Sequence, residues 1–272
     1  MDSIRAVTRR YPVAFVVLLC ILMTPLTYGV SALLNLIPLS YGQAVFAESV
    51  HMLWPVGIAL LFGYRFIIRG RGFGKTLVAG LPVFVFYVFT ALITIVSALE
   101  NPEVTLQSPK NMLLGLLMMF GIGVREEVFY RGIVVNAVGR KYAGSRKGIW
   151  FTVLLSGALF GVVHMYNLFT GVTFLNAVVQ STGAMAIGIA FTAIYLRGGN
   201  LWFLVLTHAI VDFSGLFEST FVKNNISDAE QINSISTTAP LFLLPVSLLF
   251  TAFLLRKKKL PDIIERMNAL RN

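Results

Sequence analysis

Long apolar stretches, separated by short polar segments, run along almost the whole chain. A helix needs about 20 apolar residues to cross a membrane, with a usual range of roughly 17–25. Eight stretches meet or exceed that range: residues 12–34, 44–64, 76–99, 111–138, 148–167, 174–196, 200–217 and 239–255. Because a spanning segment must satisfy its backbone hydrogen bonds internally, each stretch is expected to be helical. The pattern predicts an all-α, polytopic membrane helical bundle with about eight transmembrane helices.

Polar and small residues interrupt the sixth stretch, 174–196, more than any other. They are Asn176, Gln180, Ser181, Thr182 and Gly183. Irregular backbone at membrane depth is tolerated only where protein or water shields it. The sequence therefore makes this stretch the candidate for a broken or re-entrant span.

Basic residues alternate from one connection to the next. The even-numbered connections and both chain ends are basic, whereas the odd-numbered connections are neutral or acidic. The basic positions are Arg5, Arg9, Arg10, Arg65, Arg69, Arg71, Lys75, Arg140, Lys141, Arg146, Lys147, Arg197, Arg256, Lys257, Lys258 and Lys259. Since cytoplasmic loops carry the excess of lysine and arginine, the alternation predicts that both termini are cytoplasmic.

The composition agrees with a membrane protein. The chain has 272 residues, of which 57% are hydrophobic and 12% charged, and its mean hydropathy is +0.79. A soluble domain carries about twice that charged fraction, so residues 1–272 are expected to form a single integral membrane domain. The net charge of +10 lies in loop clusters, which indicates membrane lipids as partners and no nucleic acid. Cys20 is the only cysteine, and the sequence leaves the oligomeric state open.

Five of the chain's ionisable residues lie deep within three of the apolar stretches. They are Glu126, Glu127 and Arg131 in the fourth stretch, His164 in the fifth and His208 in the seventh. Counted at 1.5 Å per residue from the nearest basic connection, Glu126, His164 and His208 lie roughly 20, 25 and 16 Å into the membrane. Such residues are costly in lipid and usually mark functional sites. The similar depths predict one shared site built from three helices.

Helical spacing assigns different roles to the two glutamates. Glu127 and Arg131 are four residues apart, so they share a face and are expected to form a structural salt bridge. Glu126 points about 100° away from Glu127, which leaves it as the carboxylate available for chemistry. Small residues near the site, Gly157 and Gly161 among them, predict close helix approach.

Three motifs carry a resemblance to a known family. They are Glu126-Glu127-Val-Phe-Tyr-Arg131, Phe160-Gly-Val-Val-His164 and His208-Ala-Ile-Val-Asp212, each in its own apolar stretch. In type, order and placement they resemble the CPBP family of CAAX-protease and bacteriocin-processing (Abi-type) intramembrane proteases. The resemblance covers residues 111–217, the part that corresponds to the family core.

The resemblance implies a multi-pass enzyme of a prokaryotic plasma membrane that cleaves a peptide bond in a membrane-associated peptide or protein. In the family, the first glutamate and the second-motif histidine activate water, and these correspond to Glu126 and His164. The third motif stabilises the oxyanion, which corresponds to His208 and Asp212. Glu127, Arg131 and Phe160 would support the site.

Three alternatives stay open at this point. Asp212 stands where many members have asparagine, and an ionised aspartate cannot donate to an oxyanion. A zinc-dependent form would instead use His164 and His208 with Glu126 or Asp212 as ligands, although the chain has no HExxH motif, which favours a mechanism without a cofactor. The second alternative is a non-catalytic membrane protein with an immunity or regulatory role. The third is a transporter or proton channel that uses the same acids and histidines as a relay, although the sequence shows none of the inverted repeats found in many transporters.

Overall fold

The computed structural model describes residues 2–34, 51–64, 67, 70–223, 226–234 and 239–269. The predicted second stretch, 44–64, lies partly outside these residues. The connection 36–43, Arg65 and Arg69 lie wholly outside them. Within the described residues the regular elements are all helices, and the one β contact is an isolated bridge between Leu106 and Val222. The predicted class, a helical membrane protein, is confirmed.

The helices follow the apolar stretches along the chain. They are α1 (Asp2–Arg10), α2 (Pro12–Leu34), α4 (Leu53–Leu61), α5 (Phe73–Glu100), α6 (Pro109–Glu127), the π-helix η2 (Val128–Val134), α7 (Val135–Tyr142), α8 (Arg146–Val163), the 3₁₀-helix η3 (His164–Thr170), α9 (Phe174–Gly198), α10 (Leu201–Gly215), α11 (Phe217–Phe221), α12 (Asp228–Ser234), α13 (Ala239–Leu254), the 3₁₀-helix η4 (Lys257–Lys259) and α14 (Leu260–Ala269). Among the described residues, three helical segments are long and apolar enough to cross a membrane: Phe73–Glu100, Arg146–Thr170 and Phe174–Gly198. The count of eight spans stays a prediction.

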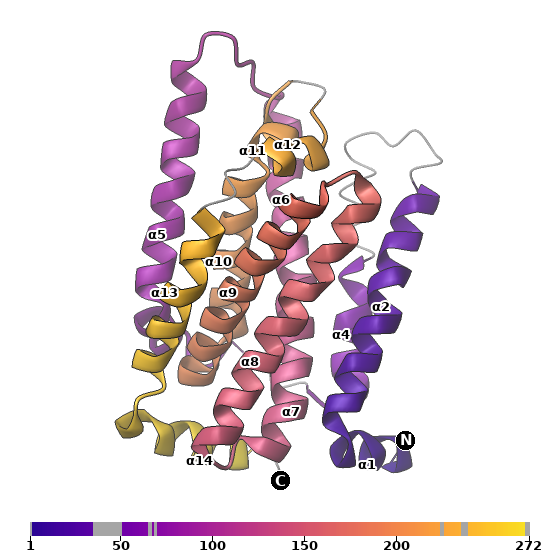
Figure 1. The fold of residues 1–272 in the computed structure, drawn as a ribbon, viewed down its shortest axis with the longest axis vertical. Coiled ribbons are helices and arrows are strands. Elements are labelled where there is room, and N and C mark those ends of the chain that lie inside the picture. The colour runs from indigo at the N-terminus through magenta and orange to yellow at the C-terminus, as the bar shows by residue number, and fades with distance from the viewer. Residues whose placement is uncertain are drawn as a thin grey trace.

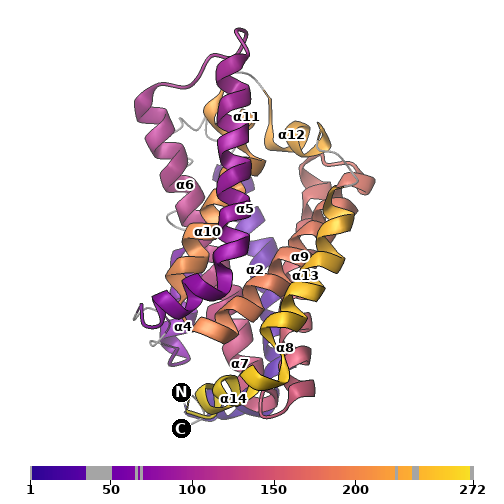
Figure 2. The same cartoon turned by 90° about the vertical axis from the view of Figure 1, so that its left-hand side faces the viewer.

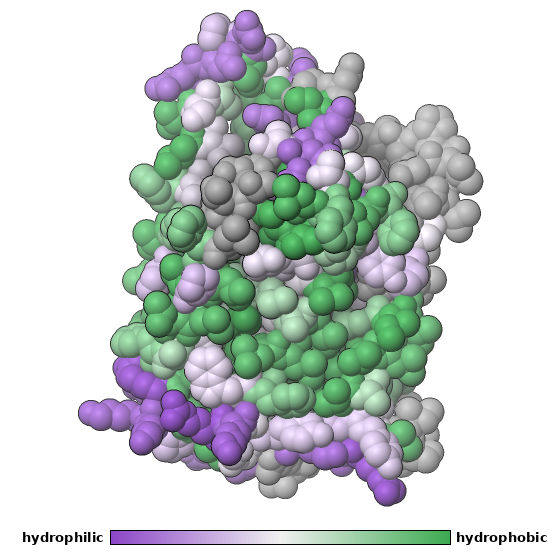
Figure 3. All heavy atoms as spheres, in the orientation of Figure 1, coloured by the Kyte–Doolittle hydropathy of each residue, from purple (hydrophilic) through white to green (hydrophobic). Residues whose placement is uncertain are grey.

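The helices stand side by side in a bundle, with α9 inside it (Figures 1 and 2). Helix α9 packs against α8, α13 and α5, while α10 packs against α6 and α5. Both chain ends lie at the same end of the bundle, where α1 and α14 also lie (Figure 1). Hydrophilic residues gather at the two ends of the molecule, and hydrophobic residues cover the band between them (Figure 3).

Helix α9 corrects the interpretation of the sixth stretch. It is one unbroken α-helix from Phe174 to Gly198, and most of its length is buried inside the protein. Its polar side chains bond to protein rather than facing lipid: Ser181 Oγ donates to Gly161 O at 2.8 Å, and Gln180 Oε1 accepts from Asn167 Nδ2 at 2.7 Å. The polar residues therefore mark a helix buried on most sides, not a break in a span.

Glycines allow two close helix crossings near the centre of the bundle. A Cβ atom added to Gly161 of α8 would lie 2.6 Å from Ser181 O of α9. One added to Gly123 of α6 would lie 2.9 Å from Val205 O of α10 and 3.5 Å from His208 Cβ. The two distances to carbonyl oxygens are shorter than ordinary contacts, so only glycine lets these backbones approach so closely. The predicted close approach is present, and Gly123 is the glycine that brings α6 against α10.

Candidate active site

The buried part of the site is a three-residue cluster centred on Glu127. Its Oε1 atom accepts a hydrogen bond from Arg131 Nη1 at 2.8 Å and lies 2.7 Å from His208 Nδ1. Because a carboxylate oxygen only accepts, His208 Nδ1 must carry the proton in this contact. The side chains of Glu127 and Arg131 are 0% exposed and that of His208 is 5% exposed. Glu127 thus connects α6, η2 and α10 in the interior.

The predicted ion pair between Glu127 and Arg131 is present, but the sequence did not indicate its third member. Helical spacing relates Glu127 to Arg131 because both lie on one continuous helix. It carries no information on how α10 crosses that helix, and the crossing brings His208 to the same carboxylate oxygen.

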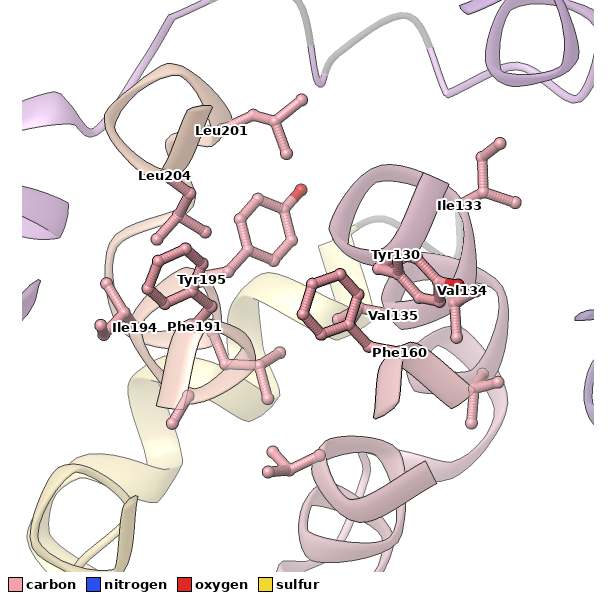
Figure 4. Packing of buried hydrophobic residues seen from close by; sticks show 14 of the residues in the cluster. Tyr130, Ile133, Val134, Val135, Phe160, Phe191, Ile194, Tyr195, Leu201 and Leu204 are labelled. Carbon is pink, nitrogen blue, oxygen red and sulfur yellow. The ribbon is translucent and has the colours of Figure 1, made fainter. Parts of the chain in front are cut away.

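Aromatic rings enclose the Arg131 guanidinium. Its Cζ lies 4.8 Å from the ring centroid of Phe160 and 5.3 Å from that of Phe191, and Nη2 donates to Gly188 O at 3.3 Å. Figure 4 shows the rings of Tyr130, Phe160 and Phe191 pointing into the interior from η2, α8 and α9. A cation over aromatic faces is attracted most strongly where water is excluded. Phe160 therefore packs between the arginine and the two site histidines, whose rings it meets edge-on.

The more exposed part of the site contains Glu126, Arg125 and Asp212. Glu126 Oε1 accepts from Arg125 Nη2 at 3.0 Å, and its Oε2 lies 3.5 Å from His208 Nε2. Asp212 Oδ1 lies 3.6 Å from the same Nε2. The side chains of Arg125, Glu126 and Asp212 are 18%, 20% and 17% exposed. One ring nitrogen of His208 therefore faces the buried carboxylate and the other faces two accessible ones.

Glu126 forms an ion pair with its neighbour in the sequence. Helical spacing places Glu126 away from Glu127, as predicted, but Arg125, the residue just before it in the chain, binds its carboxylate. Helical spacing relates helix faces only, and a long guanidinium side chain can reach beyond its own face. Glu126 is consequently held in place by a cation.

His164 lies at the junction of α8 and η3. Its Nδ1 lies 2.8 Å from Phe160 O, and since a carbonyl only accepts, Nδ1 donates and Nε2 carries the lone pair of the neutral ring. The half-buried ring of His164 packs edge-on against Phe160, which also packs edge-on against the ring of His208. The structure thus brings together the residues predicted from all three motifs.

The π-helical turn beside the site was not predicted from the sequence. All seven residues of η2, Val128–Val134, are buried. The buried Asn136 lies just beyond it, and its Nδ2 contacts Arg131 O at 2.9 Å. A polar residue in an apolar run was the only available signal. π-helical turns often occur at functional sites.

The fold and the site define a helical membrane protein that buries a Glu–Arg–His cluster and has a second, half-buried glutamate beside it. Residues 108–214 match the family described as "Type II CAAX prenyl endopeptidase Rce1-like". The match confirms the resemblance inferred from the three motifs and supports a CAAX-protease-type hydrolase. Searches of curated proteins and of solved structures found no significant match.

Proposed function

We propose that this protein is an intramembrane endopeptidase that hydrolyses a peptide bond of a membrane-associated peptide or protein. The observation that carries the proposal is the contact between Glu126 and His208, which lie on different helices. Ionisable side chains are costly inside an apolar bundle, and those found there usually belong to a functional site. The family match supports the same reaction class.

In the proposed mechanism, Glu126 and His164 activate a water molecule. Glu126 takes a proton as the water oxygen attacks the substrate carbonyl carbon, and His164 orients the water through its Nε2 lone pair. The C–N bond then breaks, and the proton passes to the leaving amine. Glutamate and histidine are both common general acid–base groups, and such catalysis is typically worth about 10²–10⁴-fold in rate.

We assign the stabilisation of the oxyanion to His208 Nε2. Glu127 fixes the ring orientation from the other side through Nδ1. Asp212 cannot donate while ionised, so its proposed role is to orient the ring from one helical turn away. The carboxylates around His208 stabilise a positively charged ring by Coulomb attraction, and a charged ring has a proton on Nε2 to donate.

We propose that the reaction needs no metal. Among the described residues, no three histidine, cysteine, aspartate or glutamate side chains are grouped so as to hold a metal ion. The guanidinium groups of Arg125 and Arg131 bind the carboxylates of Glu126 and Glu127, and these two cations would repel a divalent metal ion. Treatment of the purified protein with 1,10-phenanthroline is therefore expected to leave the cleavage rate unchanged. A rate that falls and is restored by added Zn²⁺ would establish the metal-dependent form instead.

We propose that the chain crosses a prokaryotic plasma membrane eight times, with both termini in the cytoplasm. The two termini at one end of the bundle and the basic residues near them support this orientation (Figure 1). In a Cys20→Ser background, an impermeant maleimide applied to intact cells should label Glu103→Cys but not Lys258→Cys. Both positions are exposed, so the reverse labelling pattern would invert the topology.

The direct test of the function is cleavage in proteoliposomes. The first substrate is a prenylated CAAX peptide, because the matched family is described by that substrate class. Mass spectrometry of the products identifies the bond that is cut, and the Glu126→Gln variant serves as the inactive reference. Equal product formation by both proteins would refute the assignment.

A further inference from the structure

The helical rod that carries the first motif contains one irregular turn. Helices α6, η2 and α7 follow one another without a break from Pro109 to Tyr142. At the end of η2, Val135 N donates to Tyr130 O, five residues back, whereas an α-helix uses the carbonyl four residues back. A π-helical turn contains one residue more than an α-helical turn. It therefore rotates the side chains of the following helix by about 100° about the helix axis, relative to those of the preceding helix.

Both ends of the rod are fixed against different neighbours. On the α6 side, a Cβ on Gly123 would lie 2.9 Å from Val205 O of α10. On the α7 side, α7 packs against α8, α2 and α14. If the π-turn became α-helical, one end would have to rotate away from its neighbour. Rotation of the α6 end would remove Glu126 and Glu127 from His208.

Asn136 holds the end of the π-turn. Its Nδ2 donates to Arg131 O and to Gly132 O, each at 2.9 Å, and lies 3.1 Å from Tyr195 Oη. Because both carbonyls can only accept, the amide nitrogen must be the atom that faces them. The side chain is 0% exposed, so water cannot replace these contacts. Asn136 thus satisfies carbonyls at the point where the backbone pattern changes from π to α.

We propose that Asn136 is a positioning residue, which keeps the π-turn and thereby holds Glu126 and Glu127 in register with His208. The geometry of this proposal is independent of the reaction, but its effect on catalysis rests on the proposed function. Asn136 touches no reacting group, and it acts through the Arg131 and Gly132 backbone. Arg131 in turn binds Glu127 through its side chain.

The test compares Asn136→Ala with Asn136→Ser. The two replacements have similar size, but a serine hydroxyl can donate to the carbonyl four residues back, which here is Gly132 O. The matched control is Asn200→Ala, since Asn200 is also buried and its Nδ2 also donates to two carbonyls, Gly70 O and Arg71 O. These lie in a connection away from the site.

The first readout needs no activity. The chain has three histidines, so ¹⁵N-histidine labelling gives a spectrum in which His51→Gln and His164→Gln assign the ring signals. Asn136→Ala should shift the His208 ring signals, Asn136→Ser should recover part of the shift, and Asn200→Ala should leave them unchanged while lowering the melting temperature. Unchanged His208 signals in a folded Asn136 variant would overturn the proposal. If Asn136→Ala does not fold, Asn136→Ser decides.

The second readout is the rate of cleavage per folded molecule. A misplacement of about 1 Å can cost up to about 100-fold in rate, so Asn136→Ala should lower kcat by up to that factor and leave KM unchanged. A purely structural role would lower the folded fraction but not kcat per folded molecule, and that result would also overturn the proposal. If Asn136→Ala shifts the His208 signals but the unaltered protein cleaves no substrate, the proposed function is refuted and the positioning role of Asn136 stands.

Discussion

Glu126→Gln is expected to lower the rate of peptide cleavage by about 100- to 10,000-fold, the usual contribution of a general base. Glutamine has almost the same shape as glutamate and can still accept from Arg125, but its amide cannot take a proton from water. The side chain is 20% exposed, so water can solvate the polar groups that the replacement leaves. Expression and thermal stability should therefore stay close to those of the unaltered protein.

Single-turnover cleavage in proteoliposomes measures this effect, and thermal unfolding verifies the fold. Glu103→Gln is the matched control, because Glu103 is an exposed carboxylate in the connection between α5 and α6; that variant should cleave normally. A Glu126→Gln protein that cleaves at the unaltered rate would remove Glu126 from the chemistry. Loss of activity in the Glu103 control would point to an effect of charge on substrate binding instead.

Several helix boundaries follow closely from the sequence. The stretches 12–34, 76–99 and 200–217 became Pro12–Leu34, Phe73–Glu100 and Leu201–Gly215. Hydrophobic runs predict these limits because the cost of exposing polar groups to lipid acts on each segment separately. Helix α9 was harder to interpret, since its polar side chains bond to other helices. Such bonds depend on neighbours that are distant in the sequence.

In the site, too, contacts within one helix could be predicted and contacts between helices could not. The ion pair between Glu127 and Arg131 follows from spacing along a single helix. The bond from His208 to Glu127 depends on the crossing of α6 and α10, which Gly123 permits. The π-turn was not predictable either. It sets the rotation of α7 relative to α6, which depends on how each of these helices packs against its neighbours and not on local propensity. The sequence thus identified which residues converge, and tertiary packing determines which atoms meet.

The largest effect on stability is expected from Arg131→Met. Methionine keeps an apolar side chain of similar length against Phe160 and Phe191, but it removes the cation that binds Glu127. Both partners are 0% exposed, so the variant leaves a buried carboxylate with His208 as its remaining partner. Breaking a buried pair in this way costs about 3–5 kcal/mol. Arg146→Met, a change at an exposed arginine, should have little effect.

A double variant separates loss of the pair from loss of packing. In Glu127→Gln/Arg131→Met both charges are gone, and the glutamine carbonyl can still accept from His208 Nδ1. Replacing a buried pair as a whole is often nearly neutral, so the double variant should be more stable than Arg131→Met alone. The measurement is the free energy of unfolding of the four proteins of this cycle in detergent, which isolates the coupling between the two residues. If the double variant were as unstable as Arg131→Met, the guanidinium would stabilise the bundle through its aromatic contacts rather than through Glu127.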